Sequence, residues 1–239
     1  MWRRKALSAA GDPPGAFARC PRVVCTGSMR AKLVVMAAVL ASAGAAQDWE
    51  LGGGVGYGAY RSGTVFGSNG QTATAEILNR FTAGAVIGQQ PYDFISGELR
   101  WTYQDGHAVL TAAGVREEMD GHSHTVTYDV LFHFRRRERR LRPFFAAGAG
   151  VKGYIANGPP PQQNPLAAVA SLVERDEWKP AFDLGAGLKY RLTGRVQLRF
   201  DFRDYLTTFP KQQIVPAAYS TARGIFQQFT PMAGVSYVF

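Results

Sequence analysis

The chain has 239 residues, and its 27 basic and 18 acidic residues give a formal net charge of +9. Positions 1–46 hold seven of the basic residues and one of the acidic ones, so a chain that begins at residue 47 carries only +3. We therefore infer no nucleic-acid partner from the charge. Both cysteines, Cys20 and Cys25, also precede residue 47, which excludes disulfides and thiolate metal sites from the rest of the chain.

Residues 29–46 have the pattern of a secretory signal peptide. Arg30 and Lys32 precede an apolar run at 33–40, and small residues follow, as signal peptidase requires at its cleavage site. The run is too short for a membrane-spanning helix, which needs about 20 residues. We expect Sec-type export with cleavage after Ala46, and the Ala43-x-Ala45 pattern offers a nearby alternative site.

Residues 1–28 do not fit this leader. They contain five basic residues and no apolar run, and the Arg3-Arg4-Lys5 triplet has no apolar core close behind it, as a twin-arginine signal requires. We interpret 1–28 as a disordered upstream extension that results from a wrongly assigned start codon. Translation is then expected to begin at Met29.

From Trp49 onward, apolar and polar residues alternate with a period of two, which predicts strands with one apolar and one polar face. In the segment 94–104, for example, Leu99 and Trp101 oppose Glu98 and Arg100. Eight such strands are expected, at 49–60, 80–88, 94–104, 125–134, 144–155, 178–191, 196–205 and 229–239. An even number suits a closed antiparallel barrel with both chain ends on one side.

The connections between these segments alternate in length. Short ones are expected at 89–93, 135–142 and 192–194, and long ones at 61–79, 105–124, 156–177 and 206–224. A barrel that crosses a membrane has short turns on one side and long loops on the other, whereas a soluble sandwich has no reason for this pattern. A soluble barrel or sandwich remains the alternative. Within the third long loop, 166–173 is expected to form a short helix or an apolar loop surface.

The turn at 192–194 is expected to be a three-residue hairpin loop with Gly194 in the left-handed conformation. This register places Asp183 directly opposite Arg203 on the next strand.

The polar faces of the predicted strands carry long charged side chains. They are Glu98, Arg100, Asp129, Lys152, Asp183, Lys189, Arg191, Arg199, Asp201 and Arg203. An eight-stranded barrel is about wide enough for its own side chains, so we expect these residues to plug the lumen as a network of ion pairs. The apolar faces then meet lipid, with an aromatic girdle at the interface. We assign to the girdle Trp49, Trp101, Tyr103, Trp178, Tyr190, Tyr205 and Tyr237.

The last segment, 229–239, alternates apolar and smaller residues and includes Tyr237 and Phe239. It resembles the closing strand and C-terminal assembly signal of bacterial outer-membrane β-barrels. Together with the strand count, the loop pattern and the signal peptide, it makes residues 47–239 resemble the small OmpA/OmpX-like outer-membrane barrel family.

This resemblance implies an all-β fold, namely an eight-stranded antiparallel transmembrane β-barrel with short periplasmic turns and long extracellular loops. It also implies location in the outer membrane of the Gram-negative envelope. The expected partners are outer-membrane lipids, lipopolysaccharide, the barrel-assembly machinery and an unidentified extracellular ligand.

We expect no catalytic, cofactor-binding or metal-binding residues, and a role in envelope structure or in surface interaction through the extracellular loops. One alternative is a narrow porin-like channel for small solutes or ions. A further alternative is a lipid-modifying enzyme, such as a lipid A deacylase, whose family places His and Ser two residues apart on an outward strand face. No such pair occurs, and His133 is expected to face the lumen.

Two more segments have alternative interpretations. His122 and His124, close to Asp120, could ligate zinc or copper at the surface, but we interpret them as part of a solvated loop. The basic run at 135–142 lies in a predicted periplasmic turn. We interpret it as a solvated turn, and contact with anionic lipid headgroups or peptidoglycan is the alternative.

Overall fold

The computed structural model describes residues 48–239, apart from 69, 160, 162–164 and 223. The predicted upstream extension and signal peptide therefore lie outside the described residues. No helix in the described part of the chain is long and apolar enough to cross a membrane.

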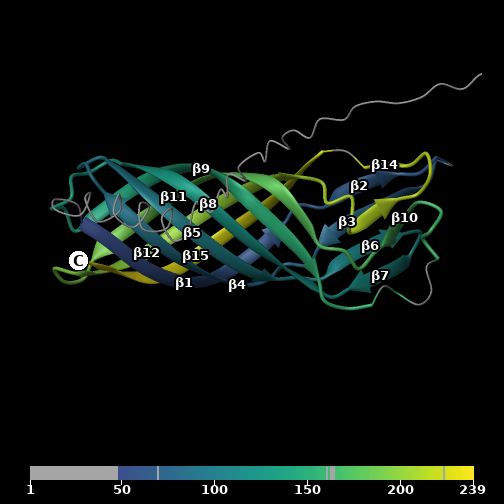
Figure 1. Cartoon of the computed structure of the whole chain (residues 1–239), viewed down its shortest axis with the longest axis horizontal. Helices are drawn as coiled ribbons and strands as arrows, with labels where there is room; N and C mark the ends of the chain where they lie inside the picture. Colours follow the sequence, from purple (N-terminus) through teal and green to yellow (C-terminus); the bar gives the residue numbers. More distant parts are fainter. Residues whose placement is uncertain (1–47, 69, 160, 162–164, 223) are drawn as a thin grey trace, which may run out of the picture. The chain divides into compact units, whose positions relative to one another are not determined.

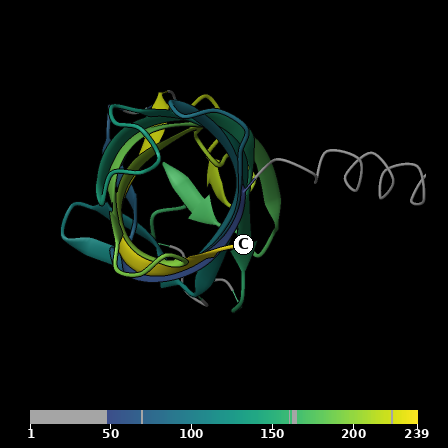
Figure 2. The same ribbon diagram turned by 90° about the vertical axis from the view of Figure 1, so that its left-hand side faces the viewer.

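Eight long strands form a closed barrel (Figure 1), which appears as a ring when viewed end-on (Figure 2). They are β1 (Asp48–Tyr60), β4 (Arg80–Gln90), β5 (Ile95–Asp105), β8 (Gly121–His133), β9 (Leu141–Ala156), β11 (Glu177–Arg191), β12 (Val196–Thr208) and β15 (Ile225–Val238). All neighbours are antiparallel, and the ring closes because β1 pairs with both β15 and β4. The predicted eight-stranded antiparallel barrel is confirmed.

The two faces of each strand have the polarity that the alternation predicts. On β5, Leu99 and Trp101 are 47% and 42% exposed, whereas Glu98 and Arg100 are 1% and 2% exposed. Apolar side chains thus cover the outside and charged ones fill the inside, which is the reverse of a soluble protein.

The predicted register between β11 and β12 is wrong by two residues. Asp183 pairs with Tyr205, and Arg203 lies opposite Gly185. The turn is longer than expected, because the Leu192 amide donates to the Val196 carbonyl at 2.9 Å. Gly194 is also not among the described residues with a positive φ. A shift of two residues keeps every side chain on its face, so the hydrophobic pattern cannot distinguish these registers.

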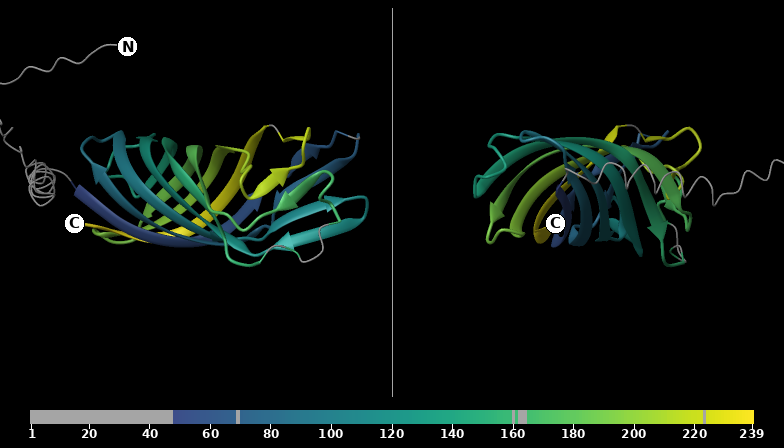
Figure 3. Two further views of the ribbon diagram at one scale, coloured as in Figure 1. Left: turned by 45° about the vertical axis from the view of Figure 1, so that its right-hand side comes forward. Right: turned by 60° about the vertical axis from the view of Figure 1, so that its left-hand side comes forward.

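The four long connections contain seven further strands. They are β2 (Gly63–Phe66), β3 (Thr72–Ile77), β6 (Ala108–Ala112), β7 (Val115–Met119), β10 (Ala170–Leu172), β13 (Ile214–Pro216) and β14 (Thr221–Ala222). Five of them form one sheet, in the order β14-β2-β3-β6-β7, and β10 pairs with β13. They lie at the end of the barrel away from the chain's carboxyl terminus (Figure 1 and Figure 3), and we call them the cap. Because the sequence pattern indicated open loops here, these strands were not predicted.

The cap has an apolar core, which the strand pattern explains. On β3, Ala73, Ala75 and Ile77 are buried, while the intervening Thr74 is exposed. The core consists of Val65, Ala73, Ala75, Ile77, Ala108, Leu110, Met119, Tyr154, Leu166, Val169, Ala170, Leu172, Phe209, Ile214, Ala222 and Phe226. The expected helix or surface at 166–173 is wrong, because this stretch forms a turn and β10 and buries Leu166, Val169, Ala170 and Leu172 in this core.

The hairpin of β6 and β7 is closed by a two-residue turn. Ala113 and Gly114 have φ angles of 48° and 82°. Two positive φ angles define a type I′ turn, whose twist matches that of antiparallel strands. The turn thus fixes the register of the hairpin that forms one edge of the cap sheet.

Candidate functional site

The structure offers two candidate sites, the lumen of the barrel and the surface of the cap. In the lumen, nine of the ten charged side chains predicted there are at most 8% exposed, and Arg191 is the exception. Arg191 is half-buried near the barrel end, where it donates to the backbone carbonyl of Arg137.

Arg203 on β12 is at the centre of the lumen network. Its Nη1 lies 3.0 Å from Oδ2 of Asp129 and 3.0 Å from Oδ2 of Asp183. Its Nη2 lies 3.5 Å from Oε1 of Glu98. A Cβ at Gly185, directly opposite on β11, would collide with the Arg203 side chain, so the glycine leaves the space that this arginine occupies.

Glu98 on β5 links Arg203 to the rest of the network. Its carboxylate lies 2.6 Å from Nη2 of Arg100 and 2.7 Å from Nη2 of Arg199. Since β5 and β12 are not neighbours in the barrel, the pairs between Glu98 and the β12 arginines cross the lumen. Asp201 also takes part, at 3.2 Å from Nη2 of Arg100. These ion pairs fill the space between opposite walls.

Glu50 completes the network but was missing from the predicted set. It accepts from Lys189 Nζ at 2.5 Å and from Arg199 Nη1 at 2.9 Å. Glu50 is buried, and the next four residues on its strand face are glycines. The inward parity of Glu50 was the signal that could have identified it. Five carboxylates and four cations are joined in one network that draws on β1, β5, β8, β11 and β12.

Lys152 lies in a different environment. Among the described residues no carboxylate lies within ion-pair distance of its ammonium group, which bonds to Gln228 instead. The ammonium group faces the rings of Tyr60, Tyr154 and Tyr205, with centroids at 4.6, 5.2 and 6.0 Å. Tyr205 was predicted in the lipid-facing girdle, which is wrong: it shares the inward face of β12 with Arg203 and is 1% exposed.

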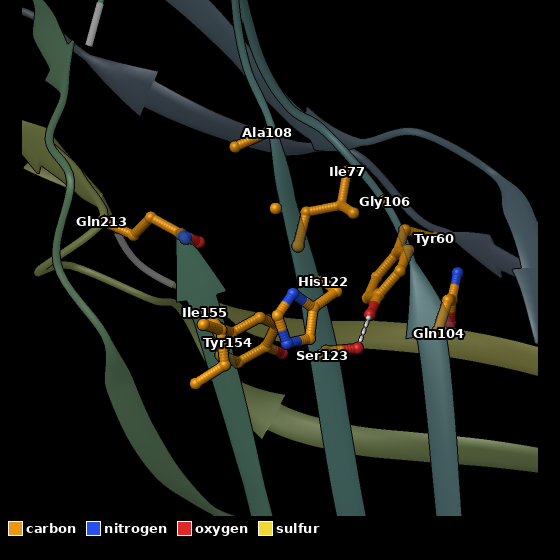
Figure 4. Close-up of a pocket in the computed structure, with 11 residues that line it drawn as sticks. Tyr60, Ile77, Gln104, Gly106, Ala108, His122, Ser123, Tyr154, Ile155 and Gln213 are labelled. Atoms are coloured by element: carbon orange, nitrogen blue, oxygen red, sulfur yellow. Dashed lines mark hydrogen bonds between the residues drawn. The ribbon is translucent and has the colours of Figure 1, made fainter. Parts of the chain in front are cut away.

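A small hollow lies where the barrel meets the cap (Figure 4). There the hydroxyls of Tyr60 and Ser123 are hydrogen-bonded at 3.2 Å, and Gln104 donates to the carbonyl of Gly58 at 3.1 Å. Tyr154 lines the same hollow and bonds to Thr207 at 2.7 Å. Hydrogen-bonded neutral groups, together with the Lys152 ammonium group beside them, therefore occupy the layer between the ion pairs and the cap.

The cap presents apolar side chains to solvent as well as burying them. Phe66 on β2 and Tyr219, which precedes β14, are 55% and 93% exposed. Tyr219 has a φ of 63°, an uncommon conformation for a residue with a side chain. Exposed aromatic side chains on a rigid support are typical of interaction surfaces.

The three histidines that the sequence alternatives involved, His122, His124 and His133, all lie on β8. His122 and His124 are on β8, not in a loop, with ring centroids 5.0 Å apart, and His124 stacks on Trp101 at 5.9 Å. In the described part of the chain, no group of three His, Cys, Asp or Glu side chains is placed to hold a metal. His133 faces the lumen, where its Nε2 lies 2.9 Å from Oγ of Ser96, and both residues are 4% exposed.

The last strand ends at the barrel rim. The amide of Phe239 donates to the carbonyl of Trp49 at 3.0 Å, so the chain end is held against β1. Tyr237 and Phe239 are 42% and 63% exposed, and their rings lie 6.1 Å apart. Both rings are accessible at the membrane-facing surface, and recognition by the assembly machinery stays a prediction.

The inverted polarity, the closed eight-stranded ring and the filled lumen define a small β-barrel of the bacterial outer membrane. The family model described as "Outer membrane protein beta-barrel domain" matches residues 31–239, and the chain belongs to that family. It is an outer-membrane protein of the Gram-negative envelope.

Known structures of similar fold share little sequence with this chain. Neisserial surface protein A (NspA) is 12% identical, with a TM-score of 0.46, over 80% of this chain and 97% of that one. The N-terminal β-barrel domain of Pseudomonas aeruginosa OprF is 15% identical, with a TM-score of 0.44, over 80% and 97%. The Escherichia coli outer membrane protease OmpT is 10% identical, with a TM-score of 0.43, over 81% and 96%. No curated protein matches the chain.

Proposed function

We propose that the protein is a non-enzymatic surface-interaction protein, in which the barrel is a sealed anchor and the cap contacts an extracellular partner. The observation that carries this proposal is the apolar core of the cap. Fixing the backbone of one residue costs about 1–2 kcal/mol in conformational entropy, so four long loops stay ordered only if burial offsets that cost. The core of sixteen buried residues supplies such burial.

An ordered cap is suited to binding because its exposed side chains are fixed before a partner arrives. Phe66 lies on β2 directly opposite Thr221 of β14, so its backbone is held by the sheet. Pre-ordered aromatic side chains lose little entropy when they bind, and a few such residues supply most of the affinity at an interface. The filled lumen supports the same proposal, since it leaves the cap as the accessible surface outside the membrane.

A narrow channel is the second candidate, and one observation favours it. A hollow in the lumen is lined by the glycine-rich walls of β1 and β4 and by Arg100, Arg199 and Asp201. Ions could pass only if such hollows joined into a continuous water-filled path through the lumen. Liposomes that contain the full chain should not swell in an isosmotic small sugar, and swelling would favour this candidate over the first.

The proposed function can be tested by removing four of the five strands of the cap sheet, β2, β3, β6 and β7, from a barrel that still inserts. In the variant, residues 63–77 and 107–119 are each replaced by a short Gly-Ser turn, and insertion is checked by heat-dependent mobility on a denaturing gel. Cells that display the parent chain should bind at least one member of a panel of glycans and matrix proteins, and the variant should bind it at least tenfold less. Equal binding by the two, or no binding by the parent, would contradict the proposal.

A further inference from the structure

The turn between β8 and β9 and the start of β9, at the barrel end that carries the chain's carboxyl terminus, contain arginines of two kinds. The side chains of Arg137 and Arg142 bond to groups of the protein itself. Arg137 pairs with Asp48 at 3.1 Å and donates to the carbonyl of Gln90 at 2.6 Å. Arg142 is 2% exposed and donates to the side chain of Gln90 and the carbonyl of Asp93, both at 3.0 Å. These two arginines hold the turn against the neighbouring strands.

The other arginines of the turn are exposed and lack such partners. In the part of the chain that the structure describes, no acceptor lies within bonding distance of the side chains of Arg135, Arg136 and Arg139. A backbone hydrogen bond of 3.2 Å from the Arg139 amide to the Arg136 carbonyl folds the turn and keeps these cations close together. Gathering like charges is unfavourable, and Glu138 is the one carboxylate within the turn, so an anion bound between the three arginines would offset the remaining repulsion.

Two aromatic residues complete the site. Phe94 and Phe134 are 47% and 70% exposed, and together with Arg135, Arg136 and Arg139 they line a hollow of about 520 Å³. Phe134 follows the outward-facing Phe132 by two residues, so its ring continues the lipid-facing side of β8. The hollow is therefore apolar toward the membrane and cationic toward the water. We call it the rim hollow.

We propose that the rim hollow binds the headgroup of an anionic phospholipid in the inner leaflet of the outer membrane. The guanidinium groups of Arg135, Arg136 and Arg139 contact the phosphate, because their paired N–H donors match phosphate oxygens. The acyl chains lie along Phe94 and Phe134. A peptidoglycan strand offers no acyl chain to the aromatic wall, so the hollow fits a lipid better.

The experiment compares lipid retention by two variants with the same change in charge. The full chain is reconstituted in nanodiscs of phosphatidylcholine with a minority of phosphatidylglycerol, and the lipids that stay bound after transfer to detergent are identified by native mass spectrometry. The parent should retain phosphatidylglycerol. R135Q/R136Q/R139Q should lose about fivefold in affinity per arginine, since each cation near an anionic surface contributes about 1 kcal/mol. The matched control, R61Q/R116Q/R175Q, removes three exposed arginines from the opposite end and should retain the lipid as the parent does.

A second variant keeps the test decisive if the glutamine variant inserts poorly. R135K/R136K/R139K preserves the charge but removes the paired donors, and should show an intermediate loss. F134S should weaken binding of phosphatidylglycerol but not of glycerol phosphate, which separates a lipid site from a simple phosphate site. The proposal is overturned if both lipids are retained equally, if the control loses as much as the rim variant, or if purified peptidoglycan binds through the same arginines instead.

Discussion

The barrel and the cap of this protein have interiors of opposite polarity. The barrel interior is a network of ion pairs around Arg203, whose side chain is fully buried, while the cap interior is an apolar cluster that includes Leu110, also fully buried. The same alternation of residues along a strand produces both. Lipid surrounds the barrel and requires apolar residues outside, whereas water surrounds the cap and requires them inside.

The contribution of a buried side chain to stability therefore depends on whether it lies in the barrel or in the cap. In the barrel, a cation is stable where carboxylates surround it, and removal of one member leaves the others unpaired. In the cap, stability follows from apolar volume, and loss of a side chain leaves a cavity. Each of the following substitutions tests one side of this difference.

Arg203→Met should have the largest effect. It leaves Asp129 and Asp183 without their shared cation, and breaking a buried ion pair in this way costs about 3–5 kcal/mol. The free energy of unfolding of the folded barrel in lipid vesicles, measured with urea, should fall by that amount. Arg191→Met is the control, because among the described residues the Arg191 side chain bonds to a backbone carbonyl and to no carboxylate. An equal loss there would contradict a central role for Arg203.

Leu110→Ala should cost about 3 kcal/mol, but in the cap alone. Leu110 is fully buried in the cap core and contributes nothing to the lumen network. Proteolysis of the cap on intact cells should become faster, while the heat-dependent mobility of the barrel stays that of the parent. If the barrel unfolded together with the cap, the two interiors would be one cooperative unit.

Asp183→Ala should lower the free energy of unfolding of the barrel by about 2 kcal/mol. The loss is smaller than for Arg203→Met, because Arg203 keeps Asp129 at 3.0 Å and Glu98 at 3.5 Å. Urea unfolding in vesicles measures it, with Asp105→Ala, whose ion pair is about 40% exposed, as the control. An unchanged unfolding midpoint for Asp183→Ala would show that the pair adds nothing to stability.

Lys152→Met should have the smallest effect and the opposite sign. This cation is buried without a carboxylate in the described structure, and the three tyrosine rings around it offset only part of the cost of burying a charge. We expect the free energy of unfolding to rise by about 1 kcal/mol. A loss as large as that for Arg203→Met would mean that Lys152 stabilises the barrel as much as the ion-paired Arg203 does.

The sequence predicted the barrel well because each strand such as β5 alternates strictly, and parity alone sets which side chains face inward. Parity also placed Glu98 and Arg203 in the lumen. It could not fix the β11–β12 register, since a shift of two residues exposes the same faces to lipid and lumen. Parity alone would have placed both Tyr205 and Glu50 in the lumen. Tyr205 was assigned to the girdle because it is aromatic, and Glu50 was left out because most of its strand face is glycine.

The cap was missed for a different physical reason. Its strands are two to six residues long, so the alternation of β3 or β7 is too brief to stand out. The core that holds them combines residues from four separate connections, and no local pattern signals such long-range packing. The apolar residues at 166–173 were the visible signal, since a water-exposed loop has little reason to carry them.

The most direct test of a sealed anchor beneath a binding cap is the electrical conductance of the full chain across a planar bilayer. The network of ion pairs should leave no continuous wet path, so insertion should give no steady current above the bare bilayer at moderate voltage and high salt. Arg203→Gly, which opens space at the centre of the network, should conduct if it still inserts. A steady, ohmic current from the parent chain would contradict the plugged lumen and make the channel the better description.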